Sequence, residues 1–148
     1  AEFRDFEMPV YDGDLEEKSG MPEGAARLVA RIASADALVL STPEYNGGIP
    51  GSLKNAIDWV SRAEKNPLAR KPMLLLSATP GALGGIRSLW HTRVPFEALE
   101  TFVYPAMFGL PKAHEAFGPD ERFLDAKTSE RLAKLIRDFR SFALPLSA

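Results

Sequence analysis

Short apolar runs alternate with longer stretches of helical periodicity along this chain. Two of the runs, residues 37–41 and 72–77, are apolar on both faces, and a turn that contains proline follows each of them. Such runs are typical of strands in the interior of a parallel sheet that helices cover. We therefore predict two parallel strands at these positions.

Four further stretches place apolar residues at the spacing of an amphipathic helix. They cover approximately residues 22–32, 50–62, 85–100 and 128–142. We expect Pro95 to kink or restart the third helix, because proline lacks the amide hydrogen and its ring clashes with the preceding turn. The alternation of strands and helices predicts one domain over residues 1–148, a doubly wound α/β fold with a parallel sheet and helices on both faces.

The charge balance limits the partners. The chain has 18 basic and 20 acidic residues and a net charge of −2, which gives no general attraction to nucleic acid or to an anionic membrane. No apolar stretch is long enough to span a bilayer, and the first residues carry charges where a signal peptide has an apolar block. We expect a cytoplasmic protein that binds neither nucleic acid nor a membrane.

The side chains suited to metal or nucleophilic chemistry are few. The 148 residues include no cysteine, which excludes zinc-thiolate sites, iron-sulfur clusters and a cysteine nucleophile. Neither His91 nor His114 has a zinc-ligand spacing, so we predict no metal site and interpret His91 as a solvated or interface histidine. We interpret Ser52 as a helix cap, and the acidic residues 12–17 as a solvated loop rather than a calcium site. Redox chemistry would therefore need a bound cofactor.

Two loops at the carboxyl ends of the predicted strands are the candidate ligand site. Residues 42–51 and 78–85 contain six of the eleven glycines, and each loop leads into the N-terminus of a helix. Glycine lets backbone amides approach a flat ligand, and free helix amides favour an electron-rich group. Ordinary Asn-Gly, Pro-Gly and Gly-Gly turns are the alternative interpretation. Neither loop matches the dinucleotide or triphosphate motifs.

Residues 42–59, TPEYNGGIPGSLKNAIDW, closely resemble the NADPH-dependent FMN reductase family, which is flavodoxin-like and includes quinone, chromate and azo-dye reductases. Residues 77–85, SATPGALGG, join the match, and weaker similarity covers nearly all of the chain. The resemblance implies that FMN is the cofactor and that nine residues border its isoalloxazine ring: Pro43, Glu44, Tyr45, Asn46, Gly47, Thr79, Gly81, Gly84 and Gly85.

The implied reaction is hydride transfer from NADPH or NADH to flavin N5, followed by reduction of a quinone-like or other small acceptor. No catalytic side chain is expected, because the flavin carries the chemistry and the protein orients two rings. The alternatives are a non-enzymatic flavodoxin-type electron carrier, which the modest net charge disfavours, and a flavin-free binding module.

The family pattern also predicts what should precede and surround this chain. Members begin with a strand and a loop around the FMN phosphate that are absent here, so we expect further residues before Ala1 and assign no phosphate ligands. In the strand order 2-1-3-4-5 the absent strand would lie between a strand at residues 1–6 and the one at residues 37–41. We expect a homodimer or homotetramer with Trp59, Arg87 and Trp90 as contact residues, unless these side chains cover the intrachain core.

Overall fold

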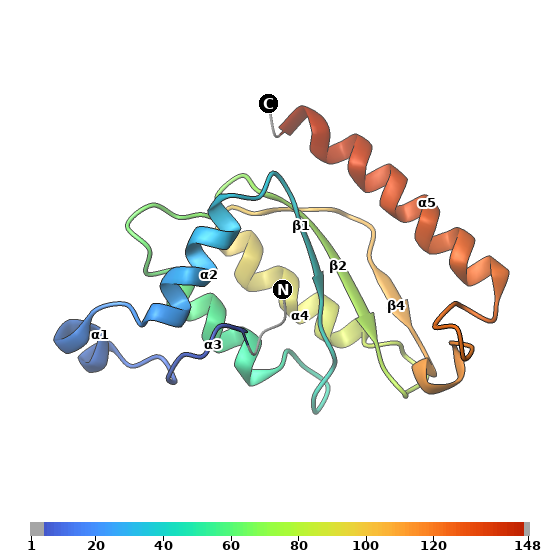
Figure 1. Ribbon diagram of the computed structural model, residues 1–148, viewed down its shortest axis with the longest axis horizontal. Helices are drawn as coiled ribbons and strands as arrows, with labels where there is room; N and C mark the ends of the chain where they lie inside the picture. The colour runs from blue at the N-terminus through green and yellow to red at the C-terminus, as the bar shows by residue number, and fades with distance from the viewer. Residues whose placement is uncertain (1–4, 147–148) are drawn as a thin grey trace.

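The computed structural model describes residues 5–146 of the chain. Two helices come first, strands and helices then alternate, and two short strands precede the longest helix (Figure 1). The helices are α1 (Gly13–Ser19), α2 (Glu23–Ala33), α3 (Gly51–Val60), α4 (Ile86–Ala98) and α5 (Ala126–Ala143). The strands are β1 (Leu38–Ser41), β2 (Pro72–Ala78), β3 (Phe102–Val103) and β4 (Phe108–Leu110).

All of the strands pair in parallel around β2. On one side β1 pairs along its whole length, from Leu38 opposite Met73 to Ser41 opposite Leu76. On the other side β3 pairs with the start of β2 and β4 pairs with its end, so residues 102–110 follow one edge of β2 in two short segments. The predicted parallel α/β sheet is confirmed.

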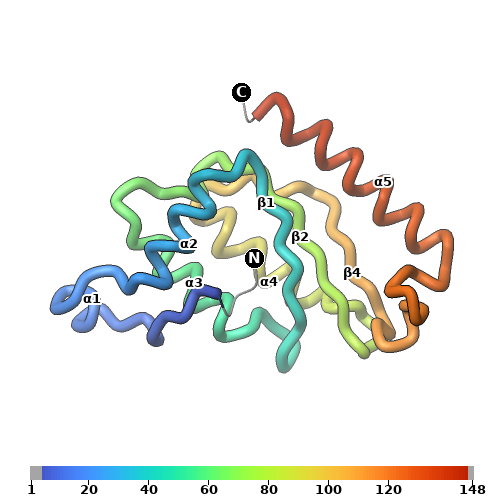
Figure 2. Tube along the Cα trace, viewed as in Figure 1, coloured from blue at the N-terminus to red at the C-terminus, as the bar shows by residue number. Residues whose placement is uncertain are grey.

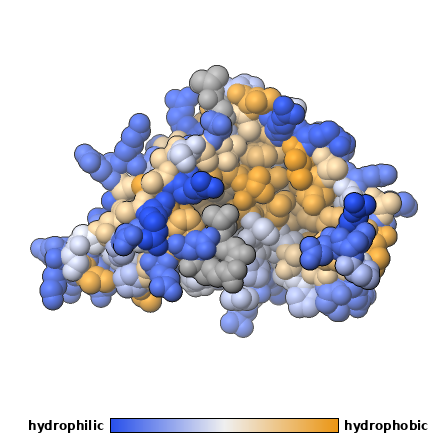
Figure 3. Space-filling view, viewed as in Figure 1, coloured by the Kyte–Doolittle hydropathy of each residue, from blue (hydrophilic) through white to orange (hydrophobic). Residues whose placement is uncertain are grey.

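Alternate side chains of β2 face two layers of helices. Met73 and Leu75 pack in a buried cluster with apolar residues of α2, α3 and α4, whereas Leu74 packs with Phe139 and Ala143 of α5. The helices consequently lie on both faces of the sheet, as the traces show (Figures 1 and 2). Over the central strands, beside α5, the space-filling view shows a gathering of apolar surface (Figure 3).

The four predicted helices are present, with ends that differ by one or two residues. The expected restart at Pro95 is wrong, because α4 runs unbroken from Ile86 to Ala98. Buried Leu89 and Phe96 hold this helix against the core on both sides of the proline. The turn after Pro95 also closes normally, since its carbonyl accepts the Leu99 amide at 3.2 Å. Packing thus outweighs the one backbone hydrogen bond that proline removes.

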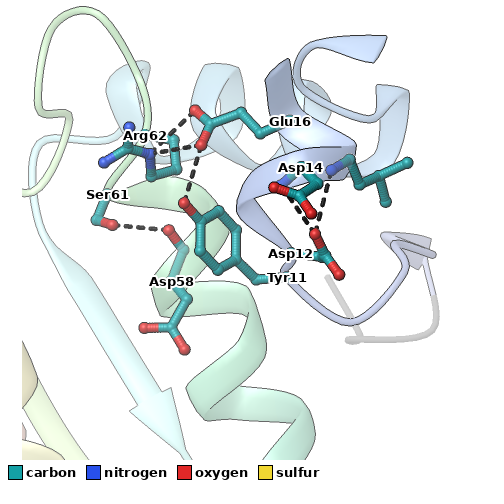
Figure 4. A network of polar contacts seen from close by, with 8 residues as sticks. Tyr11, Asp12, Asp14, Glu16, Asp58, Ser61 and Arg62 are labelled. Carbon is teal, nitrogen blue, oxygen red and sulfur yellow. Dashed lines mark hydrogen bonds and ion pairs between the residues drawn. The ribbon is translucent and has the colours of Figure 1, made fainter. Parts of the chain in front are cut away.

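The acidic segment near the N-terminus is a helix, so its interpretation as a solvated loop is wrong. Asp12 caps α1 by accepting hydrogen bonds from the Asp14 and Leu15 amides, which offsets the cost of starting a short helix. Within α1, the Glu16 carboxylate accepts hydrogen bonds from the Tyr11 hydroxyl and from Arg62 Nε, each at 2.9 Å (Figure 4). These contacts connect α1 to the residues that follow α3.

The strand expected at residues 1–6 is not found at Asp5 and Phe6, and its first four residues lie outside the described part of the chain. Among the described residues no strand pairs with the outer edge of β1, and Val39 on that strand is 59% exposed.

Candidate functional site

The first candidate loop folds back on itself directly after β1. Tyr45 and Gly48 form an antiparallel bridge, with N–H···O bonds of 3.1 and 3.0 Å in the two directions. Between them Asn46 and Gly47 have φ values of 51° and 80°, as the central pair of a type I′ turn requires. The Asn-Gly turn considered as the alternative is therefore the actual local geometry, and we call residues 43–48 the hairpin loop.

The second loop, residues 79–85, packs closely on β2 and β4. The Thr79 amide donates to the Leu110 carbonyl at 3.1 Å. Gly84 and Gly85 have φ values of 60° and 79° and are buried. A Cβ on Gly84 would lie 2.9 Å from the Gly109 carbonyl carbon, and one on Gly85 would lie 2.8 Å from Ser77 Cβ and closer still to its hydroxyl. Packing within the protein therefore requires both glycines.

Glu44 joins the hairpin loop to α4. Its Oε1 accepts hydrogen bonds from Arg87 Nε at 2.9 Å and from Arg87 Nη2, and its Oε2 accepts the Ser88 amide at 3.3 Å. The Ser88 hydroxyl in turn donates to the Pro43 carbonyl at 2.9 Å. The hydrogen bonds from Arg87 are the main cause that lowers the pKa of Glu44, so this carboxylate is ionised at neutral pH.

This contact revises one expectation. The sequence predicts free amides at both helix N-termini, but at α4 the protein's own Glu44 carboxylate takes that position. The N-terminus of α3 differs, because Pro50 begins it and provides no side-chain cap. Ser52 has no capping hydrogen bond in the described structure and instead borders a cavity beside this helix end.

A cavity of about 790 Å³ lies between α2, α3, β1 and the hairpin loop. Its walls are mainly apolar, and Thr42, Pro43, Tyr45 and Ser52 border the end near the hairpin loop. Within the described residues, the rest of this cavity follows the outer edge of β1, with which no strand pairs, and the core side chains behind it, so only the end near the hairpin loop concerns the candidate ligand site. Of the nine predicted cofactor residues, only Pro43 and Tyr45 line this cavity. A smaller cavity of about 310 Å³, between β4 and α5, contains none of them.

The structure separates the three residues expected at a subunit contact. Trp59 has no exposed surface and donates its Nε1 hydrogen to the Pro9 carbonyl at 2.8 Å, so its assignment as a contact residue is wrong. Arg87 and Trp90 lie on the exposed side of α4, where Trp90 is 57% exposed. The alternative, that the side chain covers the core of its own chain, thus applies to Trp59 alone among the three.

The role of Ser88 was missed by sequence reasoning, and Arg87 was assigned only to a subunit contact. The signal is an acidic residue in the first loop and an arginine at the second position of the helix that follows the second loop, but the two lie 43 residues apart along the chain. Among residues 5–146 no three acidic or histidine side chains are grouped to hold a metal ion. Nor does that part of the chain contain a helix with the length and hydropathy needed to cross a membrane.

The parallel sheet, its two helix layers and the paired loops at the strand ends define a flavodoxin-like α/β protein. The profile of the NADPH-dependent FMN reductases matches residues 1–115, and the chain belongs to this family. It is 32% identical to the flavoenzyme NAD(P)H:(acceptor) oxidoreductase FerB of Paracoccus denitrificans, with a TM-score of 0.78 over 89% of this chain and 72% of that one.

Two curated relatives extend the comparison. A quinone reductase of Escherichia coli is 42% identical over 97 residues, which are 66% of this chain and 52% of the relative. An NAD(P)H-dependent FMN reductase of Pseudomonas aeruginosa is 35% identical over 137 residues, which are 88% of this chain and 70% of the relative. The chain thus spans about half the length of the quinone reductase that it matches.

Proposed function

We propose that this protein is an FMN-dependent NAD(P)H oxidoreductase that reduces a quinone-like or other small acceptor. The observation that carries the proposal is the pair of glycine-rich loops, residues 43–48 and 79–85, which follow the carboxyl ends of the paired parallel strands β1 and β2. Open parallel sheets bind ligands at this end. FMN would supply the redox chemistry by accepting a hydride from NADPH or NADH and passing the electrons on.

The hairpin loop would supply the contacts to one edge of the flavin ring. Pro43 and Tyr45 border the cavity, and the amides of Asn46 and Gly47 have no hydrogen-bond partner within residues 5–146. Amide donors beside the pyrimidine edge of the ring would stabilise the negative charge that gathers there on reduction. Glu44 would act through its contact with α4, because its carboxylate is already engaged.

The second loop would form the neighbouring border of the site. Gly81 is the residue of this group that is open to a ligand, since it is exposed and a Cβ there would meet only Thr79 Oγ1, at 3.9 Å, whereas Thr79 itself is buried and would border the site from beneath the loop. Gly84 and Gly85 would shape the loop from within, as their packing against β4 and Ser77 requires. All four residues of the second loop therefore belong to the proposed site: Thr79 and Gly81 border it, and Gly84 and Gly85 shape the loop.

We further propose a cytoplasmic homodimer or homotetramer. Three exposed apolar side chains, Leu83, Trp90 and Val94, follow one another at four- to seven-residue intervals over the start and length of α4. Such a stripe suits a helix of a second copy. A sedimentation coefficient that rises with concentration supports this assembly, and the coefficient of a monomer at all concentrations excludes it.

The proposed activity is tested by titrating FMN into the flavin-free protein and then adding NADPH or NADH with a benzoquinone. We expect the flavin fluorescence to be quenched on binding and the nicotinamide absorbance to fall only when both FMN and quinone are present. Bound flavin without nicotinamide oxidation would instead indicate an electron carrier. Neither flavin binding nor nicotinamide oxidation would exclude the proposed function.

A further inference from the structure

The N-terminus of α4 has no capping side chain of its own. Gly85 precedes the helix, and its φ of 79° disfavours a Ser, Thr, Asp or Asn there. The side chain of any such residue would also collide with Ser77, because its Cβ would lie only 2.8 Å from Ser77 Cβ. A helix normally satisfies the amide of its third residue with the side chain of its capping residue. Here that third residue is Ser88, which is completely buried, and water does not reach it.

Glu44 replaces the missing cap from another part of the chain. Its Oε2 accepts the Ser88 amide, and hydrogen bonding from the Arg87 amide also lowers its pKa. The Arg87 side chain holds the other oxygen, so one carboxylate receives hydrogen bonds from both the backbone and an arginine side chain of the first helical turn. Hydrogen bonds with a charged acceptor are stronger than those between neutral groups.

The first two turns of α4 also support the rest of the hairpin loop. The Ser88 hydroxyl holds the Pro43 carbonyl at 2.9 Å. A Cβ at Gly47 would lie 3.8 Å from the Arg87 guanidinium carbon, and one at Gly48 would lie 3.4 Å from His91 Nδ1. The backbone of the hairpin loop thus lies on Arg87, Ser88 and His91, with Glu44 as its charged anchor.

We propose that Glu44 is a positioning residue that fixes the hairpin loop relative to α4 and so sets the geometry of the flavin site. This proposal rests on the proposed function where it concerns flavin, but the anchoring of the loop is independent of it. Glu44 acts through Ser88 and Arg87, and its carboxylate does not contact the ligand. The second loop leads into α4 through Gly85, so the same contact couples the two borders of the site.

The experiment compares Glu44→Ala and Glu44→Gln with the matched control Glu97→Ala. Glu97 pairs with Arg93 on the same helix, in an ion pair remote from the hairpin loop. In flavin-free protein, exchange of the hydrogen-bonded amides of Tyr45, Gly48 and Ser88 should become about tenfold faster in Glu44→Ala, the size expected for loss of a cap. Glu44→Gln keeps an oxygen acceptor and should restore most of the protection, whereas Glu97→Ala should exchange like the wild type.

In flavin titrations the dissociation constant of FMN should rise about tenfold in Glu44→Ala and by less than about threefold in Glu44→Gln. If Glu44→Ala does not fold, Arg87→Met offers the same comparison, because it removes one partner and leaves the Ser88 amide bonded. Unchanged exchange at Tyr45, Gly48 and Ser88, or equal changes in the Glu44 and Glu97 variants, would overturn the proposal. If exchange is faster in Glu44→Ala but the wild-type protein does not bind FMN, the anchoring role of Glu44 stands and only the proposed function is excluded.

Discussion

The two glycine-rich loops follow neighbouring strands, yet different forces hold them. The second loop is held by its backbone, which packs so closely on Ser77 and Gly109 that side chains are excluded at Gly84 and Gly85. The hairpin loop is packed less closely, since a Cβ at Gly47 would meet only Arg87, at 3.8 Å, and it is held by the side chains of Glu44 and Ser88. A glycine can therefore serve packing in one loop and turn geometry in the next, and only the three-dimensional neighbours distinguish the two uses.

The largest effect is expected from Gly85→Ala. The added methyl group meets Ser77 within the core and forces a positive φ on a residue with a Cβ, so the free energy of unfolding should fall by about 3 kcal/mol. Urea unfolding followed by circular dichroism measures this loss. Gly81→Ala in the same loop is the control and should stay within about 0.5 kcal/mol of the wild type, since it is exposed. A loss in Gly85→Ala as small as that in Gly81→Ala would contradict the packing role.

A smaller effect is expected from Gly47→Ala in the hairpin loop. Its φ of 80° disfavours alanine by about 1 kcal/mol, but the nearest atoms, those of Arg87, leave room for the methyl group. Stability should therefore change less than in Gly85→Ala, while the FMN dissociation constant should rise by about threefold to fivefold. Gly51→Ala, which has no atom within 4 Å of the new methyl group, provides the control. Equal FMN affinity in Gly47→Ala and Gly51→Ala would show that Asn46 and Gly47 are not part of the flavin site.

These differences show what the sequence could predict. The apolar runs of β1 and β2 and the spacing in four helices were enough for the α/β class, because a strand in a covered sheet has a continuous apolar run and a helix with one buried face has a 3.6-residue period. The segments β3 and β4 were not predicted, since two or three residues carry no periodicity and depend on pairing with β2. The helix α1 was missed because Asp12, Tyr11 and Arg62 stabilise it rather than an apolar face.

In the candidate site, too, features with a local sequence signal could be predicted and features that depend on distant contacts could not. Its loops were found from glycine content and from their place after the strands. The partner of Glu44 could not be found, because its contact with Arg87 joins positions 43 residues apart and depends on where α4 begins. Likewise, the burial of Trp59 under Pro9 and Tyr11 comes from a segment with no helical or strand pattern.

The pH dependence of the two loops should also differ. Arg87 lowers the pKa of Glu44 in the folded protein, so this group contributes stability above the ordinary glutamate pKa of about 4.3, and that contribution is lost as the pH falls through the lowered value. Exchange protection at the Tyr45 and Gly48 amides should therefore be constant from neutral pH to about pH 5 and decline below about pH 4 once intrinsic rates are corrected. Protection of the Thr79 amide, which is bonded to a backbone carbonyl, should not follow this titration. Parallel loss at both loops would indicate general acid unfolding instead.

The smallest effect is expected from breaking the control ion pair on α4. Glu97 is half exposed and meets Arg93 one turn away, and such surface pairs contribute about 0.3–0.5 kcal/mol. Arg93 also donates to the Tyr104 carbonyl at 2.9 Å, so it stays in place when Glu97 is replaced. Glu97→Gln should thus lower the urea midpoint only slightly and leave FMN binding unchanged, and the small loss should vanish in high salt. A change in flavin affinity here would mean that any charge on α4 reaches the site, and the special position of Glu44, which bonds to the start of the helix, would lose its support.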